Sequence, residues 1–366
     1  EGRWLVTVGG NATIKSWALR PGAVPPAVSG EFNDLLDANL SAVGDRLAMC
    51  GVMGVAILDL RTGEQRDLER FNRGLEGYED QLRYDVAIDA PRERVVSAGV
   101  FNAPVLDFTV FDLVSGESRV VPFSEDESIS ALRFLPDGRL LIAQRDRGLI
   151  TVADPATGAM QDITGLPRMV VYGDAGVHDI ELHPESAQNG WIYVSYTDGE
   201  EVQCTAVLDR FRLEGSRAVD VQRVFTADAY SEDAYHLAAR MAFVDGYLFV
   251  AFGDRQHPPK AQDNSNHAGA VVRLKDDGSV PGDNPFVGVE EEGKPKPRPE
   301  IWSYGHRDPM GLYRHPETGE LWLHEHGPRG GDEVHLTKTE FRLLCEFADH
   351  AGLHEAHQRE AEVPQD

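Results

Sequence analysis

The stretch ISALRFLPDGRLLIAQRDRGLITVADPATG (residues 129–158) decides the fold class. It contains three short apolar runs, Ile129–Phe134, Arg139–Gln144 and Leu149–Ala153. Sequences rich in Pro, Asp, Gly and Thr, which are residues that favour tight turns, separate the first two runs and follow the third. Each run is too short for an ordinary helix and carries the β-branched residues that suit strands. The stretch therefore predicts antiparallel strands joined by turns.

One turn phrase recurs along the chain. Asp-x-x-Thr/Ser-Gly occupies residues 59–63, 112–116 and 154–158, each time after an apolar run, at roughly 42- to 53-residue intervals. Repeats of about 40–50 residues made of four short strands are typical of propeller blades. We therefore expect an all-β protein, a β-propeller of six, possibly seven, four-stranded blades. Later blades are expected within three further ranges, Val177–Tyr196, Ala239–Leu274 and Glu300–His324.

The composition agrees with a turn-rich globular protein and argues against two functional classes. The chain has 366 residues, 41% of them hydrophobic, with 36 Gly and 21 Pro. No apolar run approaches the roughly 18 residues that a membrane-spanning helix needs. The net charge of −26 argues against a basic nucleic-acid-binding face. The three cysteines, Cys50, Cys204 and Cys345, are far apart and suggest neither a disulfide framework nor a metal site.

The densest polar region is Glu300–Val334, which reads PEIWSYGHRDPMGLYRHPETGELWLHEHGPRGGDEV from residue 299. It holds two loops, 305–309 and 325–333, that are crowded with Gly, Pro, His, Arg and acidic residues. Core packing does not require such residues, whereas rigid turns can aim carbonyls, amides and charges at a ligand. We expect a ligand or an ion to bind here.

From about residue 129 to 335 the chain resembles the soluble aldose sugar dehydrogenases (glucose/sorbosone dehydrogenase-like) that use pyrroloquinoline quinone (PQQ). These are six-bladed, calcium-binding propellers. The resemblance rests on the order and spacing of six phrases: LPDGRLLIAQRDRGLITVADPATG (135–158), GDAGVHDIELHPESAQNGWIYVSY (173–196), HLAARMAFVDGYLFVAFGDR (236–255), QDNSNHAGAVVRLKDDGSVPGDNPF (262–286), SYGHRDPMGL (303–312) and EHGPRGGDE (325–333).

The resemblance implies roles for particular residues. His236 corresponds to the family's general base, which takes the proton of the sugar's anomeric hydroxyl while hydride passes to the quinone. Imidazole suits this role because it titrates near neutral pH. Arg307 would lie beside the quinone and stabilise the negative charge of its reduction. The other expected cofactor-binding residues are Asp174, Asp308 and His326.

The resemblance also implies calcium. The backbone carbonyls of Gly327 and Pro328 would hold the ion, with Asp332 and Glu333 ligating a nearby ion or bracing the loop. Mixed carbonyl and carboxylate oxygens are a suitable ligand set for calcium. The implied partners are a small-molecule aldose and an electron acceptor, and the implied location is the periplasm or the exterior of the cell.

The chain departs from the family pattern near the expected cofactor. Asp174 stands where the family usually has Gln, and Asp308 where Asn is common. Tyr235 stands where Asp often precedes the catalytic histidine. Two added carboxylates would weaken the binding of a cofactor with three carboxylates of its own, unless calcium or Arg307 compensates.

The two ends depart further. Residues 1–128 resemble generic WD-repeat-like blades, so residues 1–335 are expected to form one propeller domain. In the family about two more blades follow EHGPRGGDE and supply cations that hold the PQQ carboxylates. Here residues 336–366 follow, with a capping box at 337–340 and the pattern of an amphipathic helix. This tail resembles the opening helix of a response-regulator winged helix, but no recognition helix follows, and we expect no nucleic-acid partner.

Three functions stay open at this point. The first is PQQ- and calcium-dependent oxidation of an aldose to its lactone. The second is a non-catalytic binding propeller that keeps the scaffold and has lost the cofactor site. The third is a calcium-dependent hydrolase of the lactonase type, which would need ion ligands from several blades that the sequence does not reveal.

Overall fold

The computed structural model confirms an all-β architecture of propeller type. It describes residues 4–9, 13–18, 39–43, 46–51, 54–59, 64–70, 85–100, 105–125, 129–200, 203–232, 234–290, 293, 295–314, 321–326 and 332–336. The expected C-terminal helix in residues 336–366 lies outside this part, apart from the strand end at 336. None of the described helices has the length and apolar character that crossing a membrane requires.

The described strands form five four-stranded sheets, one three-stranded sheet and one two-stranded sheet. The two-stranded sheet pairs β1 (Trp4–Gly9) with β2 (Thr13–Ala18). The next two sheets contain β3 (Asn39–Val43), β4 (Arg46–Gly51), β5 (Gly54–Asp59) and β6 (Gln65–Arg70), and then β7 (Asp85–Asp89), β8 (Arg94–Val100), β9 (Val105–Asp112) and β10 (Ser118–Glu125). They are followed by the sheet of β11 (Ile129–Phe134), β12 (Leu140–Gln144), β13 (Leu149–Ala153) and β14 (Met160–Asp162), and by that of β15 (Val177–Leu182), β16 (Ile192–Glu200), β17 (Gln203–Glu214) and β18 (Arg217–Thr226). The last two sheets contain β19 (Arg240–Val244), β20 (Tyr247–Ala251), β21 (Ala270–Leu274) and β22 (Ile301–Tyr304), and the three strands β23 (Pro309–Arg314), β24 (Leu321–His326) and β25 (Asp332–Leu336).

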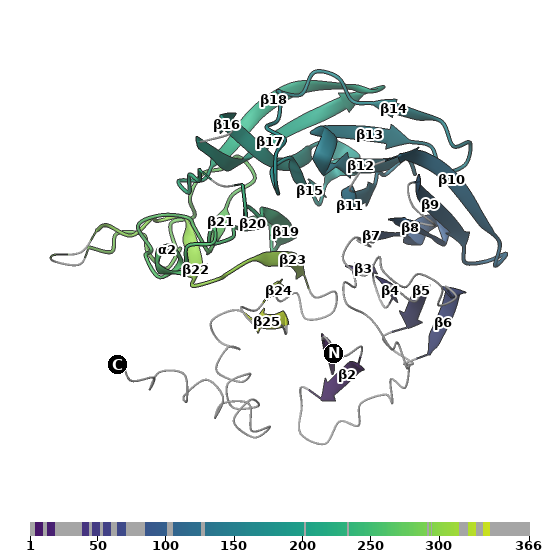
Figure 1. The fold of residues 1–366 in the computed structure, drawn as a ribbon, viewed down its shortest axis with the longest axis horizontal. Coiled ribbons are helices and arrows are strands. Elements are labelled where there is room, and N and C mark those ends of the chain that lie inside the picture. Colours follow the sequence, from purple (N-terminus) through teal and green to yellow (C-terminus); the bar gives the residue numbers. More distant parts are fainter. Residues whose placement is uncertain are drawn as a thin grey trace.

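The sheets are arranged as blades around a centre (Figure 1). The first strand of each blade packs against the first strand of the next, in the series β3, β7, β11, β15, β19 and β23. Each blade is a simple antiparallel meander in which only neighbouring strands pair. Because every blade starts at its inner strand, the loops that precede these strands lie at one end of the centre.

The repeated turn phrase has one structural role. It joins the third and fourth strands of a blade, as in β9–β10 and β13–β14. The carboxylate of Asp154 accepts the backbone N–H of Ala156, and Gly158 donates to the Asp154 carbonyl. Gly158 has a φ of 79°, a conformation that glycine adopts at little cost. The repeat therefore marks blades, as the sequence predicted.

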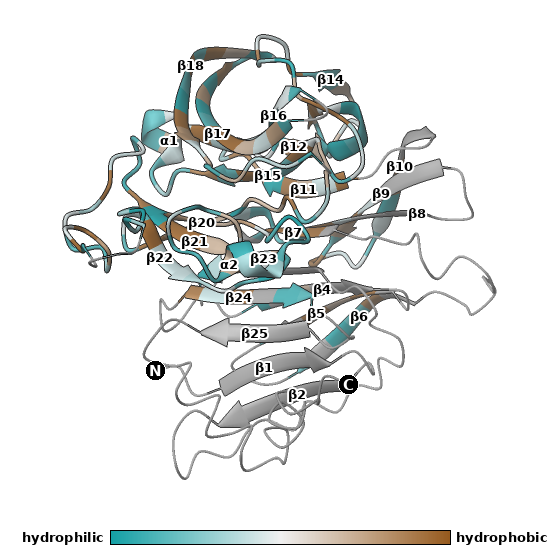
Figure 2. Ribbon diagram, turned by 60° about the vertical axis from the view of Figure 1, so that its left-hand side comes forward, coloured by the Kyte–Doolittle hydropathy of each residue, from teal (hydrophilic) through white to brown (hydrophobic). Residues whose placement is uncertain are grey.

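The apolar cores lie between successive blades. One cluster joins β16 and β17 to β19–β21 and contains Tyr193, Leu208, Met241 and Phe252. Hydrophobic colour runs along β16, β17, β20 and β21 in Figure 2. Fully burying an aromatic or branched side chain stabilises a fold by about 1.5–3 kcal/mol, so these interfaces hold neighbouring blades together.

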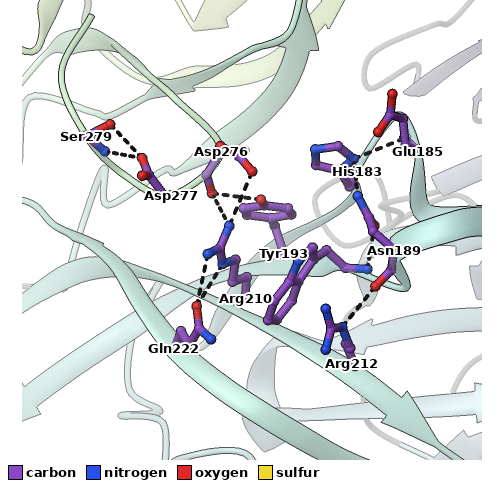
Figure 3. A network of polar contacts seen from close by, with 11 residues as sticks. His183, Glu185, Asn189, Tyr193, Arg210, Arg212, Gln222, Asp276, Asp277 and Ser279 are labelled. Atoms are coloured by element: carbon purple, nitrogen blue, oxygen red, sulfur yellow. Dashed lines mark hydrogen bonds and ion pairs between the residues drawn. The ribbon is translucent and has the colours of Figure 1, made fainter.

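Polar contacts add to the same interface at the outer part of the blades (Figure 3). Tyr193 and Arg210 both donate to the carbonyl oxygen of Asp276, in the turn after β21, at 2.8 and 2.9 Å. The ring of Trp191 lies between the guanidinium groups of Arg210 and Arg212, at 4.5 and 4.3 Å.

One expected blade boundary is wrong. The sequence assigned Glu300–His324 to a single blade, but β22 (Ile301–Tyr304) is the outer strand of the preceding sheet, paired with β21. The next sheet begins only at Pro309. The polar loop 305–308 is therefore the connection between two blades, which runs from an outer strand back to an inner one.

Candidate active site

Three loops from three consecutive blades meet at one end of the inner strands. Asp174 precedes β15, His236 precedes β19, and the pair Arg307 and Asp308 precedes β23. Nε2 of His236 lies 3.9 Å from Oδ2 of Asp308, and the charges of Asp174 and Arg307 also act on the Asp308 carboxyl. Residues as much as 134 positions apart (174 to 308) are thus brought together by blade topology alone.

His236 is oriented by a carboxylate. Its Nδ1 lies 2.7 Å from Oδ1 of Asp254, a buried residue in the turn after β20. Since an ionised carboxylate only accepts hydrogen bonds, Nδ1 carries the proton in the neutral ring, and Nε2 has the free lone pair. Nε2 lies 3.9 Å from Oδ2 of Asp308, and the side chain is 11% exposed. The arrangement leaves Nε2 without a proton, facing Asp308.

Asp308 is a carboxyl in an unfavourable place for a charge. Burial raises its pKa, and the nearby Asp174 raises it further. The two histidines His236 and His326 and the guanidinium of Arg307 act in the opposite direction, but do not cancel the effect of burial. Asp308 therefore keeps its proton to higher pH than an ordinary aspartate does.

Arg307 is held in place from both its backbone and its side chain. Its N–H donates to Oε2 of the buried Glu325 at 2.8 Å, and its carbonyl accepts the N–H of Asp254 at 2.7 Å. Its Nη1 donates to the carbonyl of His326 at 3.1 Å, and the N–H of His326 donates to the carbonyl of Asp308. The expected cofactor residues Arg307, Asp308 and His326 are thus linked in one network.

Asp174 belongs to the same site through its loop. Its N–H donates to the carbonyl of Ala234 at 2.7 Å, so the loop before β15 is attached to the loop that carries His236. A side chain on Gly173 would crowd Ala234, whose carbonyl would lie 3.1 Å from the added Cβ. The two loops are in direct contact.

The backbone around His236 is strained. His236 and Ala238 have φ values of 48° and 25°, and Arg255 and Gln256, which follow Asp254, have values of 61° and 55°. Non-glycine residues in such conformations cost on the order of 1–3 kcal/mol each. Strain of this kind persists only where the surrounding structure enforces it, and here it is concentrated at the candidate base and its carboxylate partner.

Two residues of the site were missed by the sequence reasoning. Asp254 and Arg255 lie in the phrase ending FGDR, which was quoted for the family resemblance without a role for either residue. The only signal was an acid directly after an apolar strand, next to a glycine. The sequence does not say which of the many such acids lies beside His236, because the pairing depends on the antiparallel contact of β19 with β20.

The expected calcium ligands cannot be placed. Gly327 and Pro328 lie outside the described residues, and of Asp332 and Glu333 only the backbone in β25 is described. That backbone pairs Asp332 with His326 and Glu333 with Glu325. Within the part of the chain that the structure describes, there is no group of three or more His, Cys, Asp or Glu side chains suited to a metal.

Residues 127–340 match the family model for glucose/sorbosone dehydrogenase, which is more than half of the chain. The aldose sugar dehydrogenase YliI of Escherichia coli is 36% identical over 210 residues, covering 56% of this chain and 55% of the relative. The crystal structure of the soluble aldose sugar dehydrogenase from Escherichia coli in its apo form has a TM-score of 0.51 and 36% identity, covering 57% of this chain and 60% of that one.

A further relative, quinoprotein glucose dehydrogenase B of Acinetobacter calcoaceticus, is 27% identical over 235 residues and covers 56% of this chain and 47% of its own. The chain thus spans about half the length of the curated relatives that it matches. The matched half contains every candidate site residue from Asp174 to Glu333.

Proposed function

Because the chain belongs to the glucose/sorbosone dehydrogenase family, we propose that it oxidises an aldose sugar to the lactone, with PQQ as hydride acceptor and calcium as a second cofactor. The relative from Acinetobacter calcoaceticus, a quinoprotein by name, supports the choice of cofactor. We further propose that the protein acts in the periplasm or outside the cell and that a separate electron acceptor reoxidises the cofactor.

The observation that carries the proposal is the His236–Asp254 pair. A histidine whose Nδ1 donates to a buried carboxylate presents Nε2 as a base, and the carboxylate stabilises the imidazolium once a proton arrives. Removing a hydride from the anomeric carbon requires that the hydroxyl proton leave as well. We assign the acceptance of that proton to His236.

The described side chains fit a planar, polyanionic quinone. Arg307, which points its guanidinium at the carbonyl of His326, supplies positive charge, and His326 itself adds a second polar group. Asp174 and Asp308 oppose an anion, and Arg307 lies beside them with the opposite charge. These residues would hold the cofactor, with calcium bound by Gly327 and Pro328 and supported by Asp332 and Glu333.

When bound, PQQ would supply the carbonyl carbon that accepts the hydride. The residues of this chain would accept the proton and stabilise the charge. His236 Nε2 accepts the proton of the anomeric hydroxyl, and Asp254 keeps the ring in the required tautomer. Arg307 would stabilise the negative charge that a bound quinone gains on reduction. Oδ2 of Asp308 lies 3.9 Å from this Nε2 and would border the hydroxyl group that His236 deprotonates.

A binding propeller without catalysis is the second candidate. The observation that favours it is the presence of two neighbouring carboxyls, Asp174 and Asp308, in the candidate site, since both oppose the binding of a polyanion. In that case the scaffold and the loops would persist while the quinone is not held. The two functions differ in one measurable property, the affinity for PQQ.

The test of the proposed function is His236→Ala. We expect kcat with an aldose to fall by about 10²–10⁴-fold, because general base catalysis contributes that much. The affinity for PQQ, followed by quenching of tryptophan fluorescence, should change little, because His236 is not among the residues proposed to hold the cofactor. His257→Ala, which alters an exposed histidine before α2 (Pro258–Ala261), is the control and should keep full activity. Equal turnover in the wild type and His236→Ala would exclude His236 as the base.

A further inference from the structure

Arg255 is a buried arginine next to the carboxylate that orients His236. It is 5% exposed and follows Asp254 directly in the chain. Its Nη1 donates to three carbonyl oxygens, those of His236, Leu237 and Gly253, at 2.7, 2.6 and 3.0 Å. Its Nε donates to the carbonyl of Ala229 at 3.0 Å. One guanidinium thus binds the backbone of three separate segments.

The backbone that Arg255 binds is the strained part of the site. His236 and Ala238 adopt positive φ angles, and the carbonyl groups of His236 and Leu237 lie outside the ladder of β19, which starts at Arg240. Buried carbonyls without a hydrogen bond are unfavourable, so a donor must reach them. The guanidinium supplies that donor in a place where the surrounding backbone does not.

The burial of Arg255 indicates that it is kept for geometry. Within the described residues its Nη2 has no hydrogen-bond partner, and none of its hydrogen bonds goes to a carboxylate. Burial lowers its pKa to about 10, with Cys204, Asp308 and Asp254 acting against that decrease. Burying a cation whose hydrogen-bond donors are only partly paired costs free energy, so such a group contributes little to the stability of a fold. A leucine or methionine would fill the space at lower cost.

We propose that Arg255 is the positioning residue of His236. Asp254 fixes the imidazole through Nδ1, while the adjacent Arg255 fixes the backbone of the same histidine through its carbonyl oxygen. Two consecutive residues of one turn therefore determine where Nε2 lies relative to Asp308. Only the expected change in kcat rests on the proposed function. The position of the His236 ring can be measured without turnover.

A planar guanidinium is suited to holding the backbone of His236 in place. It presents five donors in a fixed fork, so it can bind carbonyls that diverge from one another. A lysine ammonium at the same place has one nitrogen on a flexible stem and cannot reach all four acceptors in a fixed geometry. The Arg255→Lys protein should therefore keep the charge and lose part of the positioning.

The experiment compares Arg255→Met and Arg255→Lys with Arg273→Met. Arg273 is the matched control, because it is also buried and stacks on Tyr247 and Trp302, yet lies in β21 away from the histidine. The first readout is a long-range proton–nitrogen NMR spectrum of protein labelled with ¹⁵N-histidine. The His236 signals are assigned by their disappearance in His236→Ala. The second readout is kcat and KM with an aldose.

In the wild type and in Arg273→Met we expect one fixed tautomer of His236, with the proton on Nδ1. In Arg255→Met this pattern should be lost or averaged, and kcat should fall by about 10²-fold, because small displacements of a catalytic group cost that much. KM and the affinity for PQQ should change far less. Arg255→Lys should lie between the wild type and Arg255→Met in both readouts, and it keeps the test available if Arg255→Met does not fold.

Unchanged His236 signals in a folded Arg255→Met or Arg255→Lys protein would overturn the inference, whatever the activity. The failure of the proposed function gives a different result. If His236→Ala retains full turnover, His236 is not the base, while the NMR comparison still reports whether Arg255 positions it.

Discussion

The candidate base lies between two carboxyl groups that differ in environment. Asp254 is buried and accepts hydrogen bonds from the His236 ring and from the N–H of Gln256. Asp308 faces the other ring nitrogen at 3.9 Å, where burial raises its pKa. Two carboxyl groups in such different environments commonly have different roles in one site.

Asp308→Asn tests the environment of this carboxyl. When a carboxyl has a higher pKa in the folded protein than in the unfolded chain, the protein becomes less stable as pH rises from the unfolded pKa, near 3.8, through the folded pKa. The neutral asparagine removes that loss, so the variant should be more stable than the wild type at neutral pH, by an amount that shrinks as pH falls toward 3.8. Urea unfolding at a series of pH values measures this difference.

The control is Asp154, whose pKa is shifted in the opposite direction to that of Asp308. The pKa of Asp154 is lowered by hydrogen bonds from Ala156 and Thr157, so its charge favours folding above the ordinary pKa of 3.8. Asp154→Asn should lose stability relative to the wild type as pH rises. A stability of Asp308→Asn below that of the wild type at neutral pH would show that the carboxylate is favourable where it lies.

Turns at the strand ends, rather than the strands themselves, set the geometry of the site. The turn after β20 carries Gly253, Asp254 and Arg255 within three positions. A Cβ built on Gly253 would clash with the carbonyl of His236, so the two segments approach as closely as backbone atoms allow. Glycine is required here for space, because its φ is not in the left-handed region.

Gly253→Ala should therefore disturb both stability and the site. We expect a loss of about 1–3 kcal/mol of unfolding free energy, as for other overpacked positions, together with a lower kcat. Gly282→Ala is the matched control, since Gly282 has neither a positive φ nor any atom within 4 Å of an added Cβ. It should stay within about 0.5 kcal/mol of the wild type. Urea unfolding of the two variants side by side provides the comparison, and equal stability would contradict the close approach.

Across the whole molecule, polar contacts near the centre join successive blades. Ser130 of β11 donates to the carbonyl of Val177 in β15 at 2.7 Å, and Arg240 of β19 donates to the carbonyls of Ser130 and His178. Asp179 accepts the N–H of Met241 at 2.9 Å. Three of these bonds join neighbouring blades, and the bond from Arg240 to Ser130 reaches past the β15–β18 blade to the β11–β14 blade, so the position of one inner strand depends on the others near it.

Asp179→Ala tests this coupling. Asp179 is buried and also accepts a hydrogen bond from Arg133 at 3.2 Å, so its loss leaves donors of two blades without an acceptor. We expect a loss of about 3 kcal/mol. Asp220→Ala removes an exposed partner of Arg212 and should cost less than about 1 kcal/mol. Thermal unfolding measures both, and losses of equal size would contradict a central role for Asp179.

The sequence predicted the propeller and part of the site for clear physical reasons. Turn chemistry is local, so the repeated Asp-x-x-Thr/Ser-Gly phrase revealed the blades. Outer strands such as β14 (Met160–Asp162), all of whose residues are exposed, have no apolar alternation and were not recognised. The boundary at Glu300–His324 was wrong because strand length alone does not say which sheet a strand joins.

The site residues could be predicted only where a family motif contained them. His236, Arg307 and Asp308 were expected in one place, and the structure brings them together with Asp174. Asp254 and Arg255 were not foreseen, because their roles depend on contacts between the ends of β19 and β20.

The measurement that tests the account most directly is a titration of the purified protein with PQQ and calcium, followed by aldose-dependent reduction of a dye. The account predicts saturable binding of PQQ that requires calcium, and turnover that requires both. Calcium binding without PQQ binding, and no dye reduction with any aldose, would contradict it and favour the binding propeller.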